Sequence, residues 1–155
     1  MCYSAQVKAA HHAYVKHTGA QIDIEQFLEI YGFRFEDPSI RIARLVDHWF
    51  KDPKTPGERK LHKLIADQRK ADITKLEKEL FALRKRLGDA ERKLAVKPTK
   101  AAAESKRIAT DKSERALKRL ERLKDARSHA SDARIFPMHY APIVVEEDGK
   151  RLIRL

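Results

Sequence analysis

The chain has few of the residues on which several common kinds of site depend. Its 155 residues include one cysteine and five glycines. A single cysteine excludes an internal disulfide framework, and five dispersed glycines leave little room for a glycine-rich phosphate loop. No apolar run approaches the roughly 20 residues of a membrane span or the shorter core of a signal peptide. We therefore expect a cytoplasmic protein with no membrane partner.

Recognisable enzyme motifs are also missing from the chain. It contains no Ser-His-Asp order and no paired-carboxylate motif. Seven histidines are present, with His11, His12 and His17 close together in one expected helix, but one cysteine and these histidines offer no closed set of zinc ligands. We predict no metal or other cofactor, and we assign His139 no acid–base role.

Basic residues are abundant and exceed acidic residues. The chain has 34 Lys and Arg against 23 Asp and Glu, a formal net charge of +11. This excess favours polyanionic partners, nucleic acid above all, through neutralisation of phosphates and release of counterions. Charged residues make up 37% of the chain, and its long middle is too polar to bury more than one face. A compact core is therefore expected from the two ends.

The one cysteine directly follows the initiator methionine. Removal of Met1 would leave an α-amine and a thiol on Cys2. The two groups have pKa values of about 8 and about 8.5, so each is partly deprotonated near neutral pH and can act as a nucleophile. Such a residue can condense its amine with an aldehyde and close its sulfur onto the same carbon, forming a thiazolidine. The electrophile implied is an aldehyde.

Two short segments carry a resemblance to a known family. The opening Met1-Cys2-Tyr3-Ser4-Ala5-Gln6-Val7 and the late stretch Arg134-Ile135-Phe136-Pro137-Met138-His139-Tyr140-Ala141-Pro142-Ile143-Val144-Val145, followed by Asp148-Gly149-Lys150-Arg151, resemble the SRAP family. These are the SOS response-associated peptidases that process abasic sites. The match covers the first few residues and about the last twenty.

The resemblance implies an activity in the DNA damage response. Family members remove their initiator methionine autocatalytically, and the exposed cysteine captures the ring-opened sugar of an abasic site in single-stranded DNA as a thiazolidine, a DNA–protein crosslink. Cys2 would be the catalytic residue of such a hydrolase or lyase. Ala141 and Pro142 would lie beside it and border the DNA, and Arg134 is a third candidate DNA-binding residue. If the source is bacterial, the protein would be associated with the nucleoid.

The chain departs from the family pattern at two points. Tyr3 and Ser4 stand where typical members have Gly and Arg, so the arginine that would meet a phosphate is missing. The family's Asn, Glu and His partners lie downstream of the last hairpin, and nothing here matches their motifs. We therefore expect an N-terminal fragment of an SRAP-like β-rich domain, and activity of this chain by itself is left open.

Three regions are expected within an α+β fold. Residues 1–54 should supply a strand and short helices of the SRAP-like domain, 55–128 an antiparallel coiled-coil insertion, and 129–155 a return to the domain. In the first region we predict helices over 8–18, from an N-cap at Asp23 to Gly32, and over 39–50. In the last region we predict a loop over 128–133, an extended segment over 134–142, and a β-hairpin turning at Asp148-Gly149.

The middle of the chain predicts a helical hairpin. Thr55-Pro56-Gly57-Glu58 combines a capping box with a proline at the first helical position. An alternating spacing of four and three marks a coiled-coil seam, formed by Leu76, Leu80, Leu83, Leu87, Ala90 and Leu94. Lys97-Pro98-Thr99 stops this helix and caps a second one that should reach Arg127. Charges on the other faces alternate in sign, which is typical of an ordinary solvated surface.

A second hypothesis keeps Cys2 incidental. The chain would then be a non-enzymatic basic coiled-coil module that binds nucleic acid or a protein partner. A third hypothesis is an inert fragment, because without further strands Cys2 has neither a pocket nor a general base. Retention of Met1 in the purified protein would favour the second.

Overall fold

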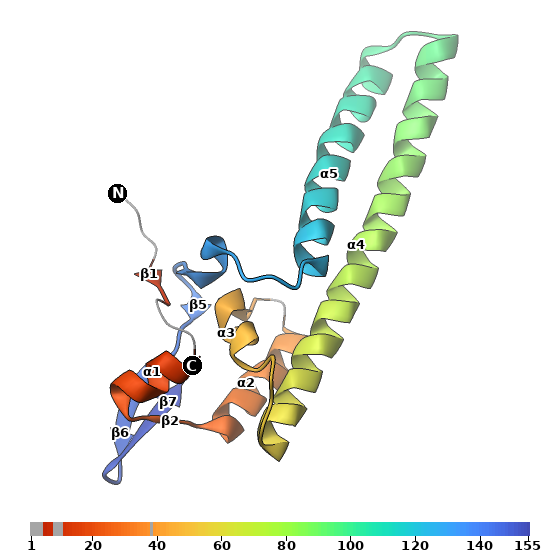
Figure 1. Ribbon diagram of the computed structural model, residues 1–155. Helices are drawn as coiled ribbons and strands as arrows, with labels where there is room; N and C mark the ends of the chain where they lie inside the picture. The colour runs from red at the N-terminus through yellow and green to blue at the C-terminus, as the bar shows by residue number, and fades with distance from the viewer. Residues whose placement is uncertain (1–4, 8–10, 38) are drawn as a thin grey trace. The chain divides into compact units, whose positions relative to one another are not determined.

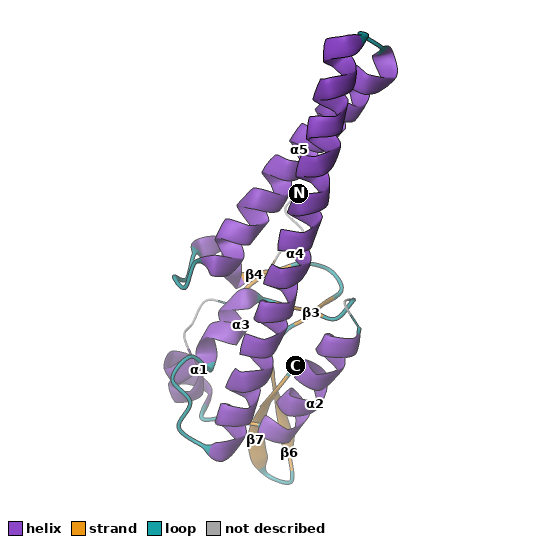
Figure 2. Ribbon diagram, turned by 90° about the vertical axis from the view of Figure 1, so that its right-hand side faces the viewer, coloured by secondary structure: helices purple, strands orange, loops and turns teal. Residues whose placement is uncertain are grey.

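The computed structural model describes residues 5–7, 11–37 and 39–155, which form two compact units. One unit contains the residues up to Gln68 together with 127–155, and the other contains residues 69–126. The first combines short helices with small sheets, and the second is a helical hairpin (Figures 1 and 2). The expected α+β fold class is confirmed at this level.

The order of the elements follows the chain as β1 (Ala5–Gln6), α1 (His11–Thr18), β2 (Gln21–Ile22), α2 (Ile24–Glu36), β3 (Arg41–Ile42), α3 (Arg44–Trp49), α4 (Pro56–Val96), α5 (Lys100–Lys124), the 3₁₀ helix η1 (Ala130–Ala133), β4 (Arg134–Ile135), β5 (His139–Tyr140), β6 (Ile143–Glu147) and β7 (Lys150–Arg154).

Local capping signals set the start of α2 but not its end. The carboxylate of Asp23 accepts a hydrogen bond from the backbone N–H of Gln26 at 3.2 Å, as the sequence predicts. The predicted stop at Gly32 is wrong, because α2 continues for another turn to Glu36. The helix ends at Asp37, where Pro38 follows and disfavours helical geometry in the residue before it.

The helix predicted over 39–50 is also shorter than expected. Residues Arg41–Ile42 form β3, which pairs in parallel with β5, so only Arg44–Trp49 is helical. The periodic spacing of apolar side chains favoured a helix, but pairing with a strand almost a hundred residues later decides the conformation of this segment. Trp49 and Phe50 are nevertheless buried, as predicted.

The last strand in the chain is the central strand of the largest sheet. β7 pairs antiparallel with β6 and parallel with β2, giving the order β2-β7-β6. Asp148 and Gly149, with φ of 51° and 72°, connect β6 and β7 with both central residues in the left-handed region, which confirms the predicted type I′ turn. Two smaller pairings join β1 to β4 and β3 to β5.

One apolar core holds the first unit together. Phe27, Val46, Phe50, Leu61 and Ile153 are its largest fully buried side chains. Phe27 lies edge-on to Phe50, with 5.7 Å between ring centroids. These residues come from α2, from α3 and the Phe50 that follows it, from α4 and from β7, so the two ends of the sequence contribute to the same core.

A polar network connects α2 to α3 at the border of this core. The phenol of Tyr31, which is 3% exposed, donates a hydrogen bond of 2.7 Å to Asp47 Oδ1. Arg34 donates to the same oxygen at 2.9 Å and lies over the Tyr31 ring. Burial, and next the Asp47 carboxylate, raise the pKa of Tyr31 well above its ordinary value of 10.0.

The hairpin begins and turns at the caps that the sequence predicts. Glu58 N–H donates to Thr55 Oγ1, and Glu58 Oε2 accepts from the Thr55 N–H, which completes a capping box. At the turn, Thr99 Oγ1 accepts from the Ala102 N–H at 3.2 Å. Helix α5 then ends at Lys124, three residues before the expected end.

Leucine and alanine side chains form the seam of the hairpin. Leu76, Leu80, Leu83 and Ala90 are buried on α4, as the predicted a/d pattern requires, whereas Leu87 and Leu94 are half-buried. On α5 the buried residues are Ala102, Ala109 and Ala116, each seven residues from the next. Small side chains at every second turn allow the axes of the two helices to approach closely. The helices run antiparallel and side by side (Figures 1 and 2).

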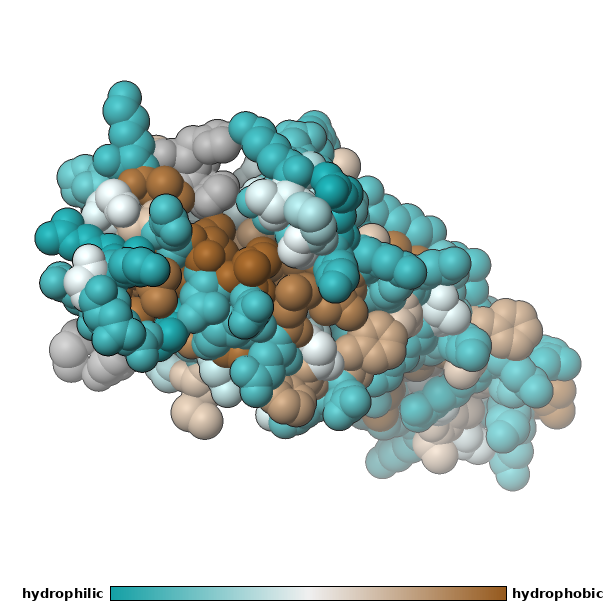
Figure 3. Space-filling view, turned by 90° about the horizontal axis from the view of Figure 1, so that it is seen from below, coloured by the Kyte–Doolittle hydropathy of each residue, from teal (hydrophilic) through white to brown (hydrophobic). Residues whose placement is uncertain are grey.

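Some large apolar side chains of the first unit remain exposed. Figure 3 shows apolar residues, in brown, between hydrophilic residues on the face drawn there. Exposed examples are Phe33 and Phe35 on α2 and Ile143 and Val144 on β6. Among the described strands β6 is at an edge of its sheet, so one row of its backbone groups has no neighbouring strand.

Candidate functional site

The predicted nucleophile, Cys2, lies outside the described residues, but the strand that follows it is described. β1 pairs antiparallel with β4, so that Ala5 is opposite Ile135 and Gln6 is opposite Arg134. The Val7 N–H adds a hydrogen bond of 2.9 Å to the Ala133 carbonyl. The two segments that carry the family resemblance are therefore neighbouring strands, and the exposed Arg134 lies beside the N-terminal one.

Ala141 and Pro142 connect two strands that belong to different sheets. They follow β5, which pairs with β3, and precede β6, which pairs with β7. Both residues are half-buried. Just before them, Met138 adopts a φ of 68° and is 90% exposed. The predicted extended segment over 134–142 is thus two short strands, β4 and β5, separated by a turn.

His139 lies two residues before Ala141. Its Nδ1 is buried and has no hydrogen-bond partner among the described residues, and its ring lies edge-on to Phe136. Burial, and next the positive charge of Arg41, lower the pKa of His139 from its ordinary value of 6.5. A neutral imidazole is therefore favoured near neutral pH.

Sequence reasoning missed a second histidine in the same unit. His48 Nε2 on α3 lies 4.0 Å from Asp132 Oδ2 on η1, and Asp132 is buried. The same carboxylate oxygen accepts a hydrogen bond of 2.8 Å from the His129 N–H. Burial, and next Arg44, lower the pKa of His48, although the charge of Asp132 opposes the shift. No local pattern links residues 84 positions apart, so the sequence held no signal for this pair.

The His48–Asp132 pair is linked to the segment that follows β1 through η1. Asp132 is adjacent to Ala133, whose carbonyl accepts from the Val7 N–H. A neutral imidazole next to a carboxylate can accept a proton, which is the property of a general base. At 4.0 Å the contact is too long for a direct hydrogen bond. The buried carboxylate instead satisfies the backbone at the start of η1.

The described part of the chain supports neither a metal site nor a membrane span. There, no three His, Cys, Asp or Glu side chains gather as metal ligands. No helix of the same residues is both long and apolar enough for a bilayer crossing. Comparison of the chain with protein-family models, curated proteins and solved structures finds no match.

Proposed function

We propose that this chain carries an SRAP-type activity: it loses Met1 by autocatalysis, and Cys2 then captures abasic sites in single-stranded DNA. The observation that supports the proposal is the pairing of β1 with β4. The two short motifs of the resemblance are separated by more than 120 residues, yet Ala5 and Ile135 are register partners. The two motifs that together carry the family resemblance thus lie on strands that pair with each other, β1 and β4.

Chain connectivity limits how far the nucleophile can be from this strand pair. Cys2 precedes Ala5 by three residues, and three residues span at most about 11 Å. Arg134 and the segment up to Pro142 are on the partner side of the pairing or follow directly from it. Of these residues, Arg134, Ala141 and Pro142 are the ones proposed to border the DNA.

The proposed reaction has two covalent stages. Water hydrolyses the Met1–Cys2 peptide bond and releases methionine. The free Cys2 amine then adds to the aldehyde carbon of the ring-opened abasic sugar, and loss of one water gives an imine. The sulfur adds to the imine carbon while its proton passes to the nitrogen, which closes the thiazolidine. The adduct has the summed mass of protein and DNA less one water, and no oxidant is consumed.

Intact-mass spectrometry tests both stages in one experiment. The full chain is incubated with a single-stranded oligonucleotide that carries one abasic site, and an undamaged strand serves as the control. We expect loss of Met1 and an adduct on the abasic strand alone. The Cys2→Ser variant should form no thiazolidine adduct.

Two results would contradict the proposal. An adduct that persists with Cys2→Ser would show that capture does not need the Cys2 thiol. Retained Met1 together with no adduct would refute activity in this chain and would favour the non-enzymatic coiled-coil module.

A further inference from the structure

The positive charge of the chain is concentrated in the hairpin. Residues 69–126 contain 19 of the 34 basic residues and ten of the 23 acidic residues, a net charge of +9. The remaining residues contribute only +2 of the total of +11. A unit of 58 residues thus carries most of the net positive charge of the protein.

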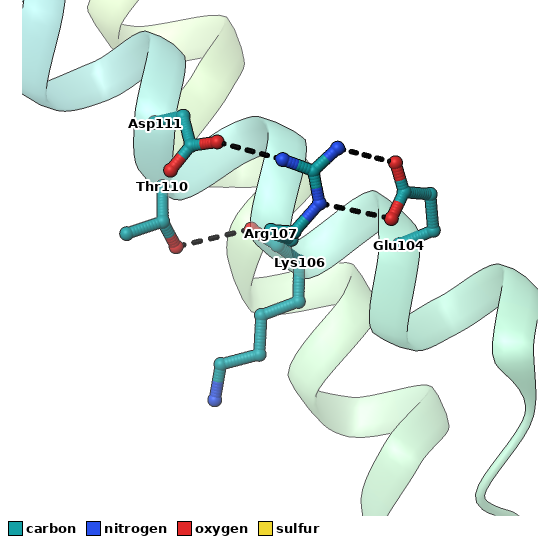
Figure 4. Close-up of polar contacts among 5 residues, drawn as sticks. All are labelled: Glu104, Lys106, Arg107, Thr110 and Asp111. Carbon is teal, nitrogen blue, oxygen red and sulfur yellow. Dashed lines mark hydrogen bonds and ion pairs between the residues drawn. The ribbon is translucent and has the colours of Figure 1, made fainter.

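Acidic side chains of the hairpin neutralise only part of this charge. Figure 4 shows one arrangement, in which Arg107 bridges Glu104 and Asp111 on α5. Across the hairpin, Lys124 pairs with Glu77 and Lys106 with Glu91. In contrast, 12 basic side chains of residues 69–126 form no ion pair or hydrogen bond with the described residues, namely Lys70, Lys75, Lys78, Arg84, Lys85, Lys93, Lys97, Lys100, Lys112, Arg115, Lys118 and Arg119.

Four of these unpaired residues share one face of α5. At about 100° per residue, Lys112, Arg115, Lys118 and Arg119 lie within a sector of about 120°. We call this set the basic stripe. All four residues are exposed. Glu114 and Glu121 lie outside the sector, and Asp111, which lies within it just before Lys112, is paired with Arg107.

A groove between α4 and α5 continues the basic surface toward the turn of the hairpin. Its volume is about 560 Å³, and its lining includes Lys85, Arg86 and Lys93 together with Asp89, which pairs with Arg92. Arg86 donates to Ser105 Oγ at 3.0 Å, which places its guanidinium across the two helices. Ser105 and Lys112 are two helical turns apart and therefore on the same side of α5. The groove and the basic stripe follow each other along one side of the hairpin.

We infer that this side of the hairpin binds the phosphate backbone of nucleic acid, single-stranded and duplex alike, without sequence preference. From Ser105 to Arg119 the surface extends for about 21 Å, a length over which a duplex carries roughly 12 phosphate charges. Phe81 is the one aromatic residue between 69 and 126, so successive bases have no stacking platform. Contact with phosphates, which every sequence presents, is the interaction that the surface offers.

The surface is separate from the chemistry proposed for Cys2. It requires no aldehyde and no lesion, so binding is measured on undamaged DNA, where covalent capture plays no part. Cys2→Ser should therefore bind undamaged DNA as the unaltered chain does. Failure of the Cys2 reaction would leave this inference intact, and failure of DNA binding by the hairpin would leave the Cys2 reaction to its own test.

The test compares two variants of the full chain that lose the same charge. The stripe variant combines Lys112→Gln, Arg115→Gln, Lys118→Gln and Arg119→Gln. The control variant removes four exposed lysines of the other unit, Lys16→Gln, Lys51→Gln, Lys60→Gln and Lys63→Gln. Fluorescence anisotropy measures binding to a labelled undamaged duplex and to its single strand between about 50 and 200 mM salt. Circular dichroism checks that both variants retain their helix content.

The expected result is loss of affinity in the stripe variant alone. At the lower salt concentration its dissociation constant for duplex should rise at least about tenfold, and the slope of log affinity against log salt should decrease by about 0.9 for each phosphate contact removed. Equal losses of DNA affinity in both variants would refute the basic stripe as the binding site, because net charge alone would then explain the result. Absence of binding by the unaltered chain at about 50 mM salt would overturn the inference itself.

Discussion

Substitution of Tyr31 by Phe should change how the stability of the first unit depends on pH. The phenol is buried and hydrogen-bonded to Asp47, and these surroundings raise its pKa well above 10.0 in the folded state. In the unfolded chain the phenol titrates near 10. Above pH 10 the unfolded state therefore loses a proton that the folded state keeps, so unfolding becomes more favourable as pH rises.

The size of the effect follows from this linkage. If the folded phenol stays protonated at pH 11, Tyr31 alone lowers the free energy of unfolding by about 1.4 kcal/mol between pH 9 and pH 11. Tyr31→Phe removes this contribution. At pH 7 the same variant should be less stable by about 1.5 kcal/mol, because the charged Asp47 loses a hydrogen bond while Arg34 remains its partner. Tyr31→Phe is thus less stable than the unaltered chain at pH 7, and its free energy of unfolding decreases less between pH 9 and pH 11.

Trp49 provides the assay, since it is the only tryptophan and is packed in the core of the first unit. Urea unfolding followed by its fluorescence at pH 7, 9 and 11 gives the free energies for the unaltered chain and for Tyr31→Phe. Tyr140→Phe, which removes an exposed phenol, is the control. An equal loss of stability in the unaltered chain and Tyr31→Phe between pH 9 and 11 would refute the reasoning, because the buried phenol would then not retain its proton.

Three further substitutions test packing, capping and turn geometry. Ala109→Leu should overfill the seam at a fully buried position and lower the free energy of unfolding of the hairpin by about 1–3 kcal/mol. Urea unfolding followed by circular dichroism measures this change. The control, Ala103→Leu on the exposed face, should not lower the free energy of unfolding. Thr99→Ala should cost about 1 kcal/mol in the same assay by removing the cap of α5, and Thr99→Ser should restore most of it. Gly149→Ala should cost about 1 kcal/mol in the first unit because its φ is 72°, and unchanged Trp fluorescence transitions would contradict that strain.

Elements that depend on near neighbours could be predicted from the sequence. The caps at Asp23, Thr55 and Thr99 each involve a residue three positions away, so a segment of four residues is enough to predict each cap. The type I′ turn at Asp148-Gly149 is equally local. The seam of the hairpin was predictable because Leu and Ala recur at a fixed spacing over several turns.

Elements that depend on distant partners could not be predicted. β3 replaces part of an expected helix because Arg41 and Ile42 pair with His139 and Tyr140. The pairing of β2 with β7 is likewise parallel and joins residues about 130 positions apart. At the candidate site, the buried Asp132 meets His48 only through the packing of η1 on α3. In each case the decisive contact is tertiary, and no pattern within either segment indicates it.

The position of β7 has a consequence for the order in which the chain can fold during synthesis. β7 is synthesised after the two strands that flank it in the sheet, and Ile153 on β7 is fully buried in the core. The hairpin forms through contacts between neighbouring segments and can fold as soon as residue 124 is available, because local contacts form fast. Phe27 and Val46, in the first 68 residues, cannot complete their core until β7 has been synthesised. During that interval the apolar side chains of the N-terminal region are exposed, which favours binding by chaperones before β7 has been synthesised.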